Sequence, residues 1–558
     1  MNYKVCSIAM AMACLGTACQ GASPIPTFDK EAVTTQPYQR TGQQDRLIDT
    51  SRINSQSGNT GTAEHPAFYI RKIVLQGTLL PVDEQEGLQQ ILRAYSQRNV
   101  EVSELSVLTQ KITEYYRSKG YTIPQAVLPA QEIQRGVLKI HVYTAAYDSI
   151  TVLKNESDVA DSVIQEYVKK LRPGDVIKDN TVEMVMNNLN DLPAVTARAV
   201  FMPGDTAGTT KMGVEVLRRP VWNNYVFFDN GGGYYSGKCR YGFHTEINNP
   251  SHGGDKVLLN GMMTNHEVKN YGVRYETPVG DDGTRWGIGW SQSSYELKTN
   301  NFYTSLGQSR GISFYGLTPL YRNRLQRLTL LYGYDHRNIK DRNRYRFDLL
   351  PGIPIAGEIS TKKTGNVFHV GLSGSQYYPN QFTQYSLIYW NGHIRTDTGS
   401  GSRPMYYDGT YHKLTGDLLN IWYDGPWNYR INASGQLANR SLDGSEQFYL
   451  GGMNGVRAYG ASDGYGDAGY LLTGEIRRQT GIKYLESAVF IDTAGAKLRN
   501  GGDRAWDHLS GWGVGLRYQK TTDWNVQLDY AWKIHGRRDR TEPEDHQGRW
   551  WLQVYKMF

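Results

Sequence analysis

Close to its C-terminus the chain reads Trp524-Asn525-Val526-Gln527-Leu528-Asp529-Tyr530-Ala531-Trp532-Lys533. Every second residue from Trp524 is apolar or aromatic, and all but Ala531 of the residues between them are polar or charged. A period of two places successive side chains on opposite faces of a β-strand. Aromatic residues at both ends with aliphatic residues between them suit a strand that crosses a bilayer between two aromatic belts. The stretch therefore predicts one strand of a membrane β-barrel.

The same alternation runs through the chain after about Pro220, and it is clear in Leu328–Tyr334, Thr383–Tyr389 and Trp512–Gln519. Residues 220–558 have room for about 16 antiparallel strands, at about 20 residues for each strand and its connection. Only 39% of all residues are hydrophobic, yet the chain has 40 Tyr and 12 Trp. Beyond the N-terminal region no apolar run is long enough for a membrane helix. A soluble sandwich also alternates, but its strands are shorter and its buried face favours aliphatic residues.

The first 66 residues are expected to lie outside the folded domains. Residues 1–22 predict a secretory signal peptide, because Lys4 precedes a short apolar stretch, Val5–Leu15, and small residues follow it. Lipidation of Cys19 stays open, although Leu15 lies one position too far upstream for the usual pattern. Residues 23–66 are polar, and within them Gln39–Arg52 predicts a short polar helix that Gly42 weakens.

Two similar α/β modules follow, in residues 67–144 and 145–219. The first alternates strand-like and helical patterns in the order β-α-α-β-β: Phe68–Leu75, Leu88–Tyr95, Leu105–Tyr116, Gln125–Leu128 and Gly136–Tyr143. The same order recurs in residues 150–217. A unit repeated after about 75 residues predicts two tandem domains.

Composition argues against several other classes of protein. Cys6 and Cys14 belong to the predicted signal peptide, so the remaining cysteines predict neither a disulfide framework nor a cysteine metal site. A net charge of +7 without a Lys/Arg cluster indicates no nucleic-acid partner. Residues 307–311 match G-x-S-x-G, but they lie among alternating strands rather than in a strand-turn-helix context. No acid, base and nucleophile converge, so we expect no enzyme activity, no cofactor and no metal.

Several short motifs, each weak alone, point in one direction together. They are Gly120-Tyr121 and Pro129-Ala130-Gln131 in the first module, Leu189-Asn190-Asp191-Leu192-Pro193 in the second, and Phe490-Ile491-Asp492-Thr493-Ala494-Gly495 in the barrel. The most specific stretch is Gly455-Val456-Arg457-Ala458-Tyr459-Gly460. The last strand finishes in Phe558, which is typical of bacterial outer-membrane barrels.

Together these motifs resemble those of the two-partner secretion transporters, the TpsB family, whose superfamily includes the BAM insertase. In that resemblance residues 67–144 are a first POTRA domain of the POTRA_2 type and residues 145–219 a second one of the ShlB type. Residues 455–460 are similar to the family's VRGY tip in the sixth extracellular loop, with Ala458 where Gly is commoner. Residues 490–495 resemble its FxDxG strand.

The resemblance implies a pore in the outer membrane of a Gram-negative cell that exports one large exoprotein by two-partner (type V) secretion, without nucleotide hydrolysis. It further implies periplasmic POTRA domains that bind the exoprotein's N-terminal secretion domain, and a plug helix within residues 23–66. The barrel would contact outer-membrane lipid and be inserted by the BAM complex. The sixth loop would fold into the barrel, where Arg457 pairs with Asp492 on the inner wall.

Three rival functions remain to be weighed. An insertase usually carries more POTRA units, and a porin carries none. A TonB-dependent receptor needs a larger plug and about 22 strands, which do not fit after residue 220. The cargo stays open among adhesin, haemolysin and contact-dependent toxin.

Overall fold

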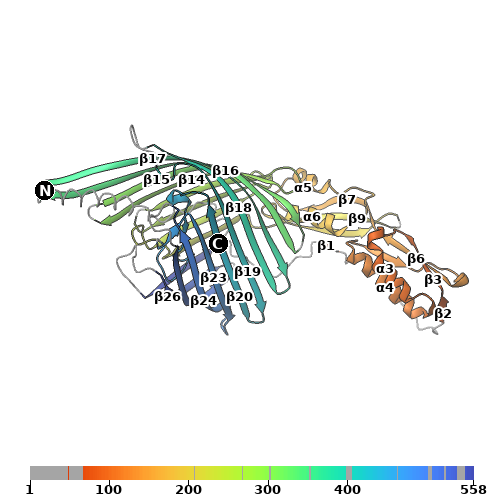
Figure 1. Ribbon diagram of the computed structural model, residues 1–558. Coiled ribbons are helices and arrows are strands. Elements are labelled where there is room, and N and C mark those ends of the chain that lie inside the picture. The colour runs from red at the N-terminus through yellow and green to blue at the C-terminus, as the bar shows by residue number, and fades with distance from the viewer. Residues whose placement is uncertain are drawn as a thin grey trace. The chain divides into compact units, whose positions relative to one another are not determined.

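The computed structural model describes residues 48–49, 67–206, 208–266, 268–300, 303–323, 325–350, 353–397, 405–461, 463–499, 506–520, 523–536 and 547–558. The predicted signal peptide and nearly all of the predicted plug and linker lie outside these ranges. The chain divides into two compact units, one that contains the α/β domains and one that contains the barrel. Each unit is described by itself (Figure 1).

The first α/β domain packs two helices against a three-stranded sheet. Its elements are β2 (Ala67–Ile70), β3 (Lys72–Gly77), η2 (Val82–Glu84), α3 (Glu86–Ala94), β4 (Arg98–Glu101), α4 (Val102–Ser118), β5 (Pro124–Val127), η3 (Gln134–Gly136) and β6 (Val137–Thr144). The sheet order is β3-β6-β5, with β3 parallel and β5 antiparallel to β6. The predicted helices and sheet strands are present. Strand β4, which pairs with β2, was not predicted because Val100 is its only apolar residue.

The second α/β domain repeats this plan. It contains β7 (Ala146–Asn155), α5 (Asp161–Val168), α6 (Asp179–Asn190), β8 (Val195–Pro203) and β9 (Thr209–Arg218). Strand β1 (Ile48–Asp49) adds to the edge of its sheet in parallel with β8, giving the order β1-β8-β9-β7. The helix predicted over Gln39–Arg52 is therefore wrong at residues 48–49, where the edge of β8 offers the backbone an extended partner.

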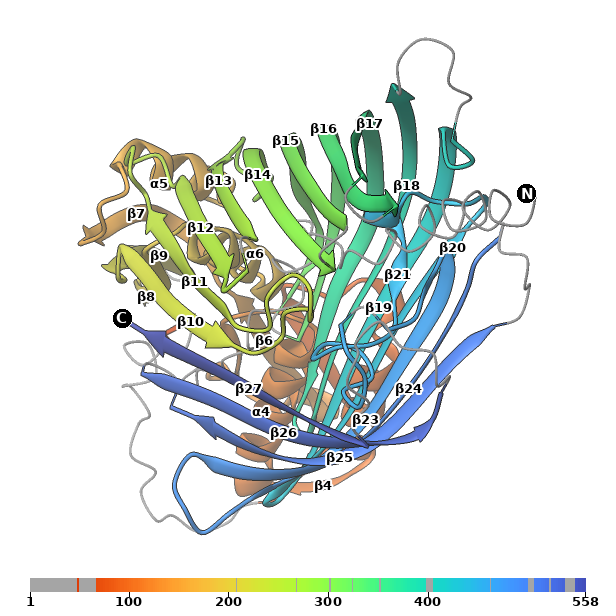
Figure 2. The ribbon, with the colours of Figure 1, turned by 90° about the vertical axis from the view of Figure 1, so that its left-hand side faces the viewer.

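The C-terminal unit is a closed antiparallel barrel in which the first strand, β10, pairs with the last, β27 (Figure 2). Its sixteen strands are β10 (Trp222–Asp229), β11 (Arg240–Asn248), β12 (Lys256–Thr264), β13 (Lys269–Pro278), β14 (Arg285–Asn300), β15 (Tyr303–Arg322), β16 (Gln326–Leu350), β17 (Ile353–Tyr378), β18 (Gln381–Asp397), β19 (Gly409–Asp424), β20 (Trp427–Ala438), β23 (Ala468–Gln479), β24 (Leu485–Lys497), β25 (Asp507–Gln519), β26 (Trp524–His535) and β27 (Gly548–Met557). The predicted barrel of about 16 antiparallel strands after two α/β modules is confirmed, whereas the predicted plug helix stays a prediction.

Side chains alternate across the barrel wall as the sequence predicts. On β26, Trp524, Leu528 and Tyr530 are exposed on the outer face, whereas Asp529 and Ala531 are fully buried on the inner face. An apolar outer face and a polar inner face are what a bilayer and a lumen select. Among the described residues, no helix combines the length and apolar character needed to span a bilayer.

Candidate functional site: a loop inside the barrel

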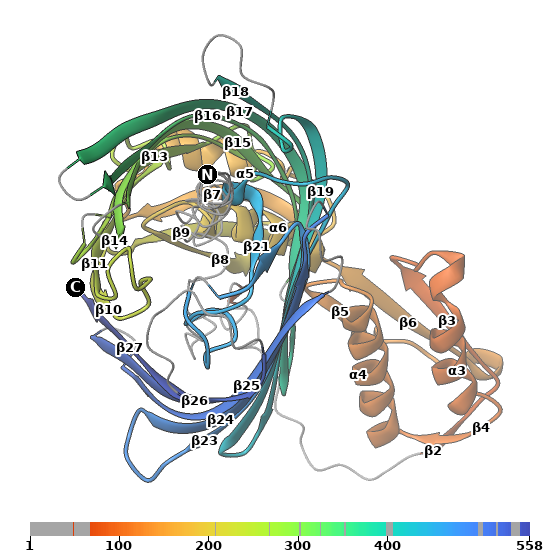
Figure 3. The ribbon, with the colours of Figure 1, turned by 60° about the vertical axis from the view of Figure 1, so that its left-hand side comes forward.

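The segment that joins β20 to β23, residues 439–467, does not extend into solvent as loops usually do. It contains the short elements η4 (Gly444–Glu446), β21 (Phe448–Tyr449) and β22 (Tyr465–Gly466). Leu450, Val456 and Tyr459 are buried, and they cluster with inner-wall residues of β24, β25 and β26. Figures 2 and 3 show β21 within the ring of strands. We call residues 439–467 the lumen loop.

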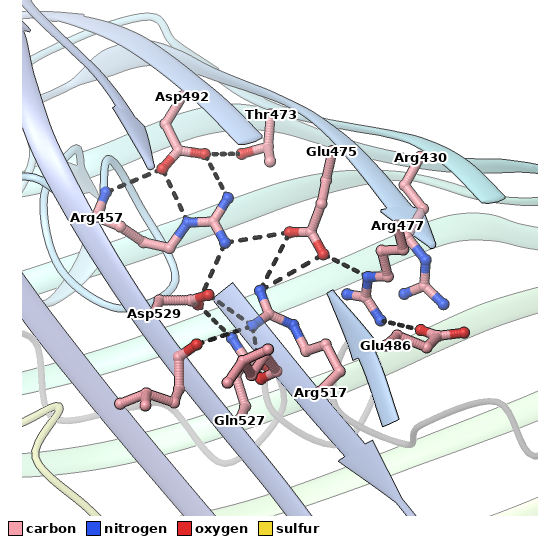
Figure 4. Close-up of polar contacts among 12 residues, drawn as sticks. Arg430, Arg457, Thr473, Glu475, Arg477, Glu486, Asp492, Arg517, Gln527 and Asp529 are labelled. Atoms are coloured by element: carbon pink, nitrogen blue, oxygen red, sulfur yellow. Dashed lines mark hydrogen bonds and ion pairs between the residues drawn. The ribbon is translucent and has the colours of Figure 1, made fainter. Parts of the chain in front are cut away.

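Arg457, at the tip of the lumen loop, is bound to Asp492 on β24 (Figure 4). Its Nε and Nη2 donate to the two carboxylate oxygens of Asp492 at 2.9 Å each, and its backbone N–H donates to Oδ2 at 3.1 Å. Thr473 on β23 donates a further bond to Asp492 at 3.0 Å. A forked guanidinium on a carboxylate is the strongest geometry for such a pair. The predicted contact is therefore present, and it is bidentate.

Two more carboxylates receive the remaining donor of Arg457. Its Nη1 lies 3.1 Å from Glu475 Oε2 and 3.3 Å from Asp529 Oδ2. Arg517 bridges the same two acids at 3.4 Å and 2.6 Å, and Arg477 contacts Glu475 as well. All members of this cluster are buried. Three guanidinium groups thus balance three carboxylates, and the loop tip contributes one of the charges.

The wider cluster was missed at the sequence level, although its signal was present. Asp529 and Arg517 stand on the polar face of two strands whose alternation is clear in the sequence. Nothing local in the sequence indicates that β23, β25 and β26 bring them to the same loop residue.

Further contacts fix the backbone of the loop tip. The Trp551 indole N–H on β27 donates to the Arg457 carbonyl at 2.6 Å, and the Tyr459 hydroxyl donates to the His535 carbonyl at 2.9 Å. The Phe490 ring lies directly under the Arg457 guanidinium, 3.2 Å from ring centroid to Cζ. Aromatic faces attract cations, so Phe490 adds to the carboxylates.

Small residues let the tip approach the wall closely. A Cβ at Gly455 would collide with the Leu450 carbonyl, and one at Gly511 on β25 would lie 2.6 Å from the Ala458 Cβ. Ala458 is thus accommodated because the wall residue opposite it is glycine. Gly460 donates its N–H to Asp463 at 2.8 Å, and a Cβ at Gly495 would meet Tyr470 and His508.

The root of the lumen loop is held by a second, separate set of charges. Glu446 accepts from Arg337 on β16 at 2.9 Å and from Lys413 on β19 at 2.5 Å. Asp443 accepts from Lys363 on β17 at 2.8 Å. Tip and root are therefore anchored to different strands of the barrel, with β23 to β27 at the tip and β16, β17 and β19 at the root.

The predicted motif residues of the first α/β domain have structural roles. Gly120 follows α4 with φ +85 and accepts from Asp179 N–H through its carbonyl at 2.9 Å. Tyr121 is buried against Tyr116, and burial raises the pKa of its hydroxyl. The Gln131 side chain, two residues after Pro129, bonds both backbone polar groups of Lys139 at 2.9 and 2.6 Å.

The motif residues of the second domain join α6 to β8. Leu189 is fully buried, and the Asn190 side chain bonds both backbone polar groups of Ala197 at 2.8 and 2.9 Å. Pro193 lies in the turn between the two elements. Phe558 is exposed after β27, and its N–H donates to the Asn224 carbonyl at 2.9 Å. The structure brings the lumen-loop motif into contact with Asp492 on β24. The motifs of the α/β domains belong to the other compact unit, and Phe558 follows β27.

A closed sixteen-stranded barrel preceded by two small α/β domains defines a class, the outer-membrane barrels with periplasmic POTRA domains. A family model described as haemolysin secretion/activation protein ShlB/FhaC/HecB matches residues 208–518, more than half of the 558 residues, so the chain belongs to this family. A model described as POTRA domain, ShlB-type, matches residues 68–144. The subtype predicted for residues 145–219 stays a prediction.

Individual relatives agree with this assignment. A heme/hemopexin transporter protein, HuxB, of Haemophilus influenzae (strain 86-028NP) is 25% identical, over 93% of this chain and 94% of the relative. The solved structure of CdiB from Escherichia coli is similar with a TM-score of 0.67 at 18% identity, covering 91% of this chain and 94% of that one. BamA from Haemophilus ducreyi, lacking POTRA domains 1–3, follows with a TM-score of 0.52 at 14% identity, covering 88% and 100%.

The protein is therefore an outer-membrane transporter of two-partner secretion, with its barrel in the outer membrane and its POTRA region in the periplasm. The predicted family, function and location are confirmed. Membership of this family rather than of the insertases also decides between the export and insertase functions in favour of export.

Proposed function

We propose that the lumen loop is the gate of the export pore and that Arg457 is its latch. The observation that carries this proposal is the burial of Arg457 among Asp492, Glu475 and Asp529 on the inner wall. An unfolded exoprotein passing through the lumen must displace this loop. Displacement requires that water or the passing chain replace the bonds of Arg457, because an uncompensated buried charge costs several kcal/mol.

The balanced charges make such a latch reversible. Exposed ion pairs contribute little, but the walls around Arg457 exclude most solvent and weaken screening. The root contacts of Glu446 and Asp443 would stay in place while the tip leaves, so that the loop swings about its root. The plug helix predicted within residues 23–66 would be a second obstruction, which must also leave the lumen before export.

The POTRA domains would receive the exoprotein's N-terminal secretion domain. Strand addition to a sheet edge needs an edge with free backbone groups. In the described residues β5 and β3 are the sheet edges of the first domain, and β7 and β1 are those of the second. Residues 67–144 and 145–219 remain our proposed limits for the two domains.

We propose no catalytic role and no cofactor: folding of the exoprotein outside the cell would draw it outward without nucleotide hydrolysis. The BAM complex would insert the barrel during biogenesis. The family description names haemolysin secretion and the name of one relative names heme/hemopexin transport, so the transported class that we propose is a large exoprotein of the adhesin, haemolysin or toxin kind.

Single-channel conductance in a planar bilayer tests the gate. The mature chain, a chain lacking residues 23–60, and the Arg457→Ala variant of each would be compared. We expect small, flickering conductance in the mature chain, larger conductance after the deletion, and the largest and steadiest conductance when both changes are combined. Equal conductance with and without Arg457→Ala would refute the latch. Equal, large conductance with and without residues 23–60 would refute the plug.

A further inference from the structure

The outer face of strand β16 changes character along its length. The even-numbered residues of β16 lie on one face of the strand. Starting from the end near Gln326, they are Leu328, Leu330, Tyr332, Tyr334, His336, Asn338, Lys340, Arg342 and Arg344. Tyr332 and Tyr334 lie opposite Val370 and Phe368 on β17, and these two partners are exposed. The face with the even-numbered residues therefore points outward. A barrel strand spans a bilayer with about 9–11 residues. Strand β16 has 25, so its basic half lies beyond the membrane.

The end of β16 that carries Lys340, Arg342 and Arg344 is the extracellular one. Residues 67–219 are periplasmic, so β10 starts at the periplasmic face and alternate strands return there; β16 therefore starts there too. The hairpin of β16 and β17 extends further than its neighbours in Figure 1. Its outward basic residues stand directly above the aromatic belt, at the level of the headgroups of the outer leaflet.

Neighbouring strands add cations at the same level. Arg310 on β15 lies opposite Asn338, Lys362 on β17 lies opposite Lys340, and Arg395 on β18 lies opposite Thr364. We call the following five residues the cationic patch: Arg310, Lys340, Arg342, Lys362 and Arg395. All but the half-buried Arg342 are exposed. None of the five has an ion-pair partner among the residues that the structure describes.

Acidic neighbours neutralise only part of the charge, because six outward-facing cations, the cationic patch and Arg344, stand against three carboxylates. Glu358 forms an ion pair with Arg344 at 2.8 Å and also attracts Arg342 and Lys340. Asp397 stands opposite Lys362 on β18, and Glu296 lies on β14 opposite Leu306. Lys340 and Lys362 face each other directly across two strands, and like charges in this position destabilise a sheet. A shared anion would relieve their repulsion, and phosphate oxygens are strong acceptors for Lys and Arg.

An apolar pocket lies on the same strands, nearer the membrane. Its volume is about 610 Å³, and its aromatic and aliphatic lining includes Trp286, Phe314, Tyr332, Tyr334, Phe368 and Val370. Tyr334 precedes Asn338 by four residues, about 14 Å along the strand. With a strand tilt of 35–45°, the height above the top of the pocket is about 10 Å at Arg310 and about 15 Å at Lys340 and Lys362. Long lysine side chains can reach back toward the pocket over part of that height. A lipid with acyl chains in this pocket carries its headgroup up to the cationic patch.

We propose that the cationic patch and this pocket together bind lipopolysaccharide, the acylated and phosphorylated glycolipid of the outer leaflet. One phosphate lies between Lys340 and Lys362, within reach of Arg310 and Arg395, and acyl chains occupy the pocket. The site would hold the long β16–β17 hairpin upright beside the exit of the pore. It is independent of the gating role proposed for the lumen loop.

The test is the binding of diphosphoryl lipid A to the full mature chain in detergent, measured by microscale thermophoresis at 150 mM salt. The variant is Lys340→Gln with Lys362→Gln, and the control is Arg478→Gln with Lys483→Gln, two exposed cations near the periplasmic end of the barrel. Each cation near an anionic lipid contributes about 1 kcal/mol of binding free energy, so the patch variant, which lacks two cations, should bind lipid A about thirty-fold more weakly. The control should bind within about two-fold of the unmodified chain. Unchanged affinity in the patch variant would overturn the proposal.

Three further measurements define the ligand and exclude misfolding. Dephosphorylated lipid A should bind the unmodified chain as weakly as lipid A binds the patch variant. Equal affinity for phosphatidylglycerol would overturn the choice of glycolipid, and competition by polyglutamate at equal charge would favour an acidic protein segment instead. In lipid-free detergent the patch variant should melt at the same temperature as the unmodified chain, because it loses both the repulsion between Lys340 and Lys362 and the attraction between Lys362 and Asp397. Lipid A should then raise the melting temperature of the unmodified chain but not that of the patch variant. An equal rise in both proteins would overturn the proposal.

Discussion

Arg457 grips Asp492 with three donors, its Nε, its Nη2 and its own backbone N–H, so the loop tip is fixed by side chain and main chain together. The backbone contact requires the turn at the tip and not only a long basic side chain. Asp492 itself is fully buried and also accepts from Thr473. The pair therefore reports both the position of the loop and its conformation.

Replacing Asp492 with Asn should loosen the tip. The amide keeps the shape but removes a charge and one acceptor, which leaves the Arg457 guanidinium undercompensated in a buried site. Loss of one partner in a buried pair costs about 3–5 kcal/mol. We expect a lower melting temperature and more frequent channel openings. Asp417→Asn is the matched control, because Asp417 lies on β19 and accepts from Ser386 without contacting the loop. Equal effects of the two changes would contradict a special role for Asp492.

Arg457→Lys should hold the loop tip on the barrel wall more weakly than arginine but better than alanine. Lysine keeps the positive charge but lacks the planar fork that reaches Asp492 and Glu475 at once. We expect openings intermediate between the unmodified chain and Arg457→Ala in single-channel records. Behaviour identical to the unmodified chain would show that charge alone holds the loop.

Whether a feature of the fold or of the lumen-loop site could be predicted from the sequence depends on how far apart its residues lie along the chain. The barrel follows from a local rule, alternation, which Trp524 to Trp532 display without any partner. The contact of Arg457 with Asp492 came from the motif resemblance and not from their spacing of 35 residues. The root contacts of Glu446 were not predicted, because Arg337 lies 109 residues away and its inward direction depends on strand register. Strand β1 likewise depends on an edge of β8 that only the folded domain supplies.

Glu446→Gln should release the root of the loop while the tip stays latched. Lys413 and Arg337 then lose a common anionic partner, and Lys413 is buried. We expect brief partial openings in bilayer recordings, distinct from the long openings of Arg457→Ala. The double variant should open more than either single variant, since tip and root use different strands. If the double variant opened no more than Arg457→Ala, the root contacts would not help to hold the loop in the lumen.

Gly511→Ala should push the tip away from β25. The added methyl group would lie 2.6 Å from the Ala458 Cβ and 2.9 Å from the Trp532 carbonyl, which is closer than either contact tolerates. Overpacking of this kind costs about 1–3 kcal/mol. Adding Ala458→Gly should relieve the methyl clash and recover part of the stability in a thermal melt. Gly474→Ala on β23 is the control, because its Cβ would meet only Ile491 at 3.6 Å. No recovery on adding Ala458→Gly would place the strain at Trp532 instead.

Asn190→Ala should weaken the second α/β domain without touching the gate. The side chain donates to the carbonyls of Met186 and Ala197 and accepts from the Ala197 N–H, so its removal leaves half-buried backbone groups without partners. Each unsatisfied buried group costs about 1–3 kcal/mol. We expect faster proteolysis within residues 145–219 and unchanged channel conductance. The exposed Asn180→Ala is the control and should leave the proteolysis rate unchanged. A changed conductance in Asn190→Ala would instead indicate that the stability of this domain is coupled to the lumen loop.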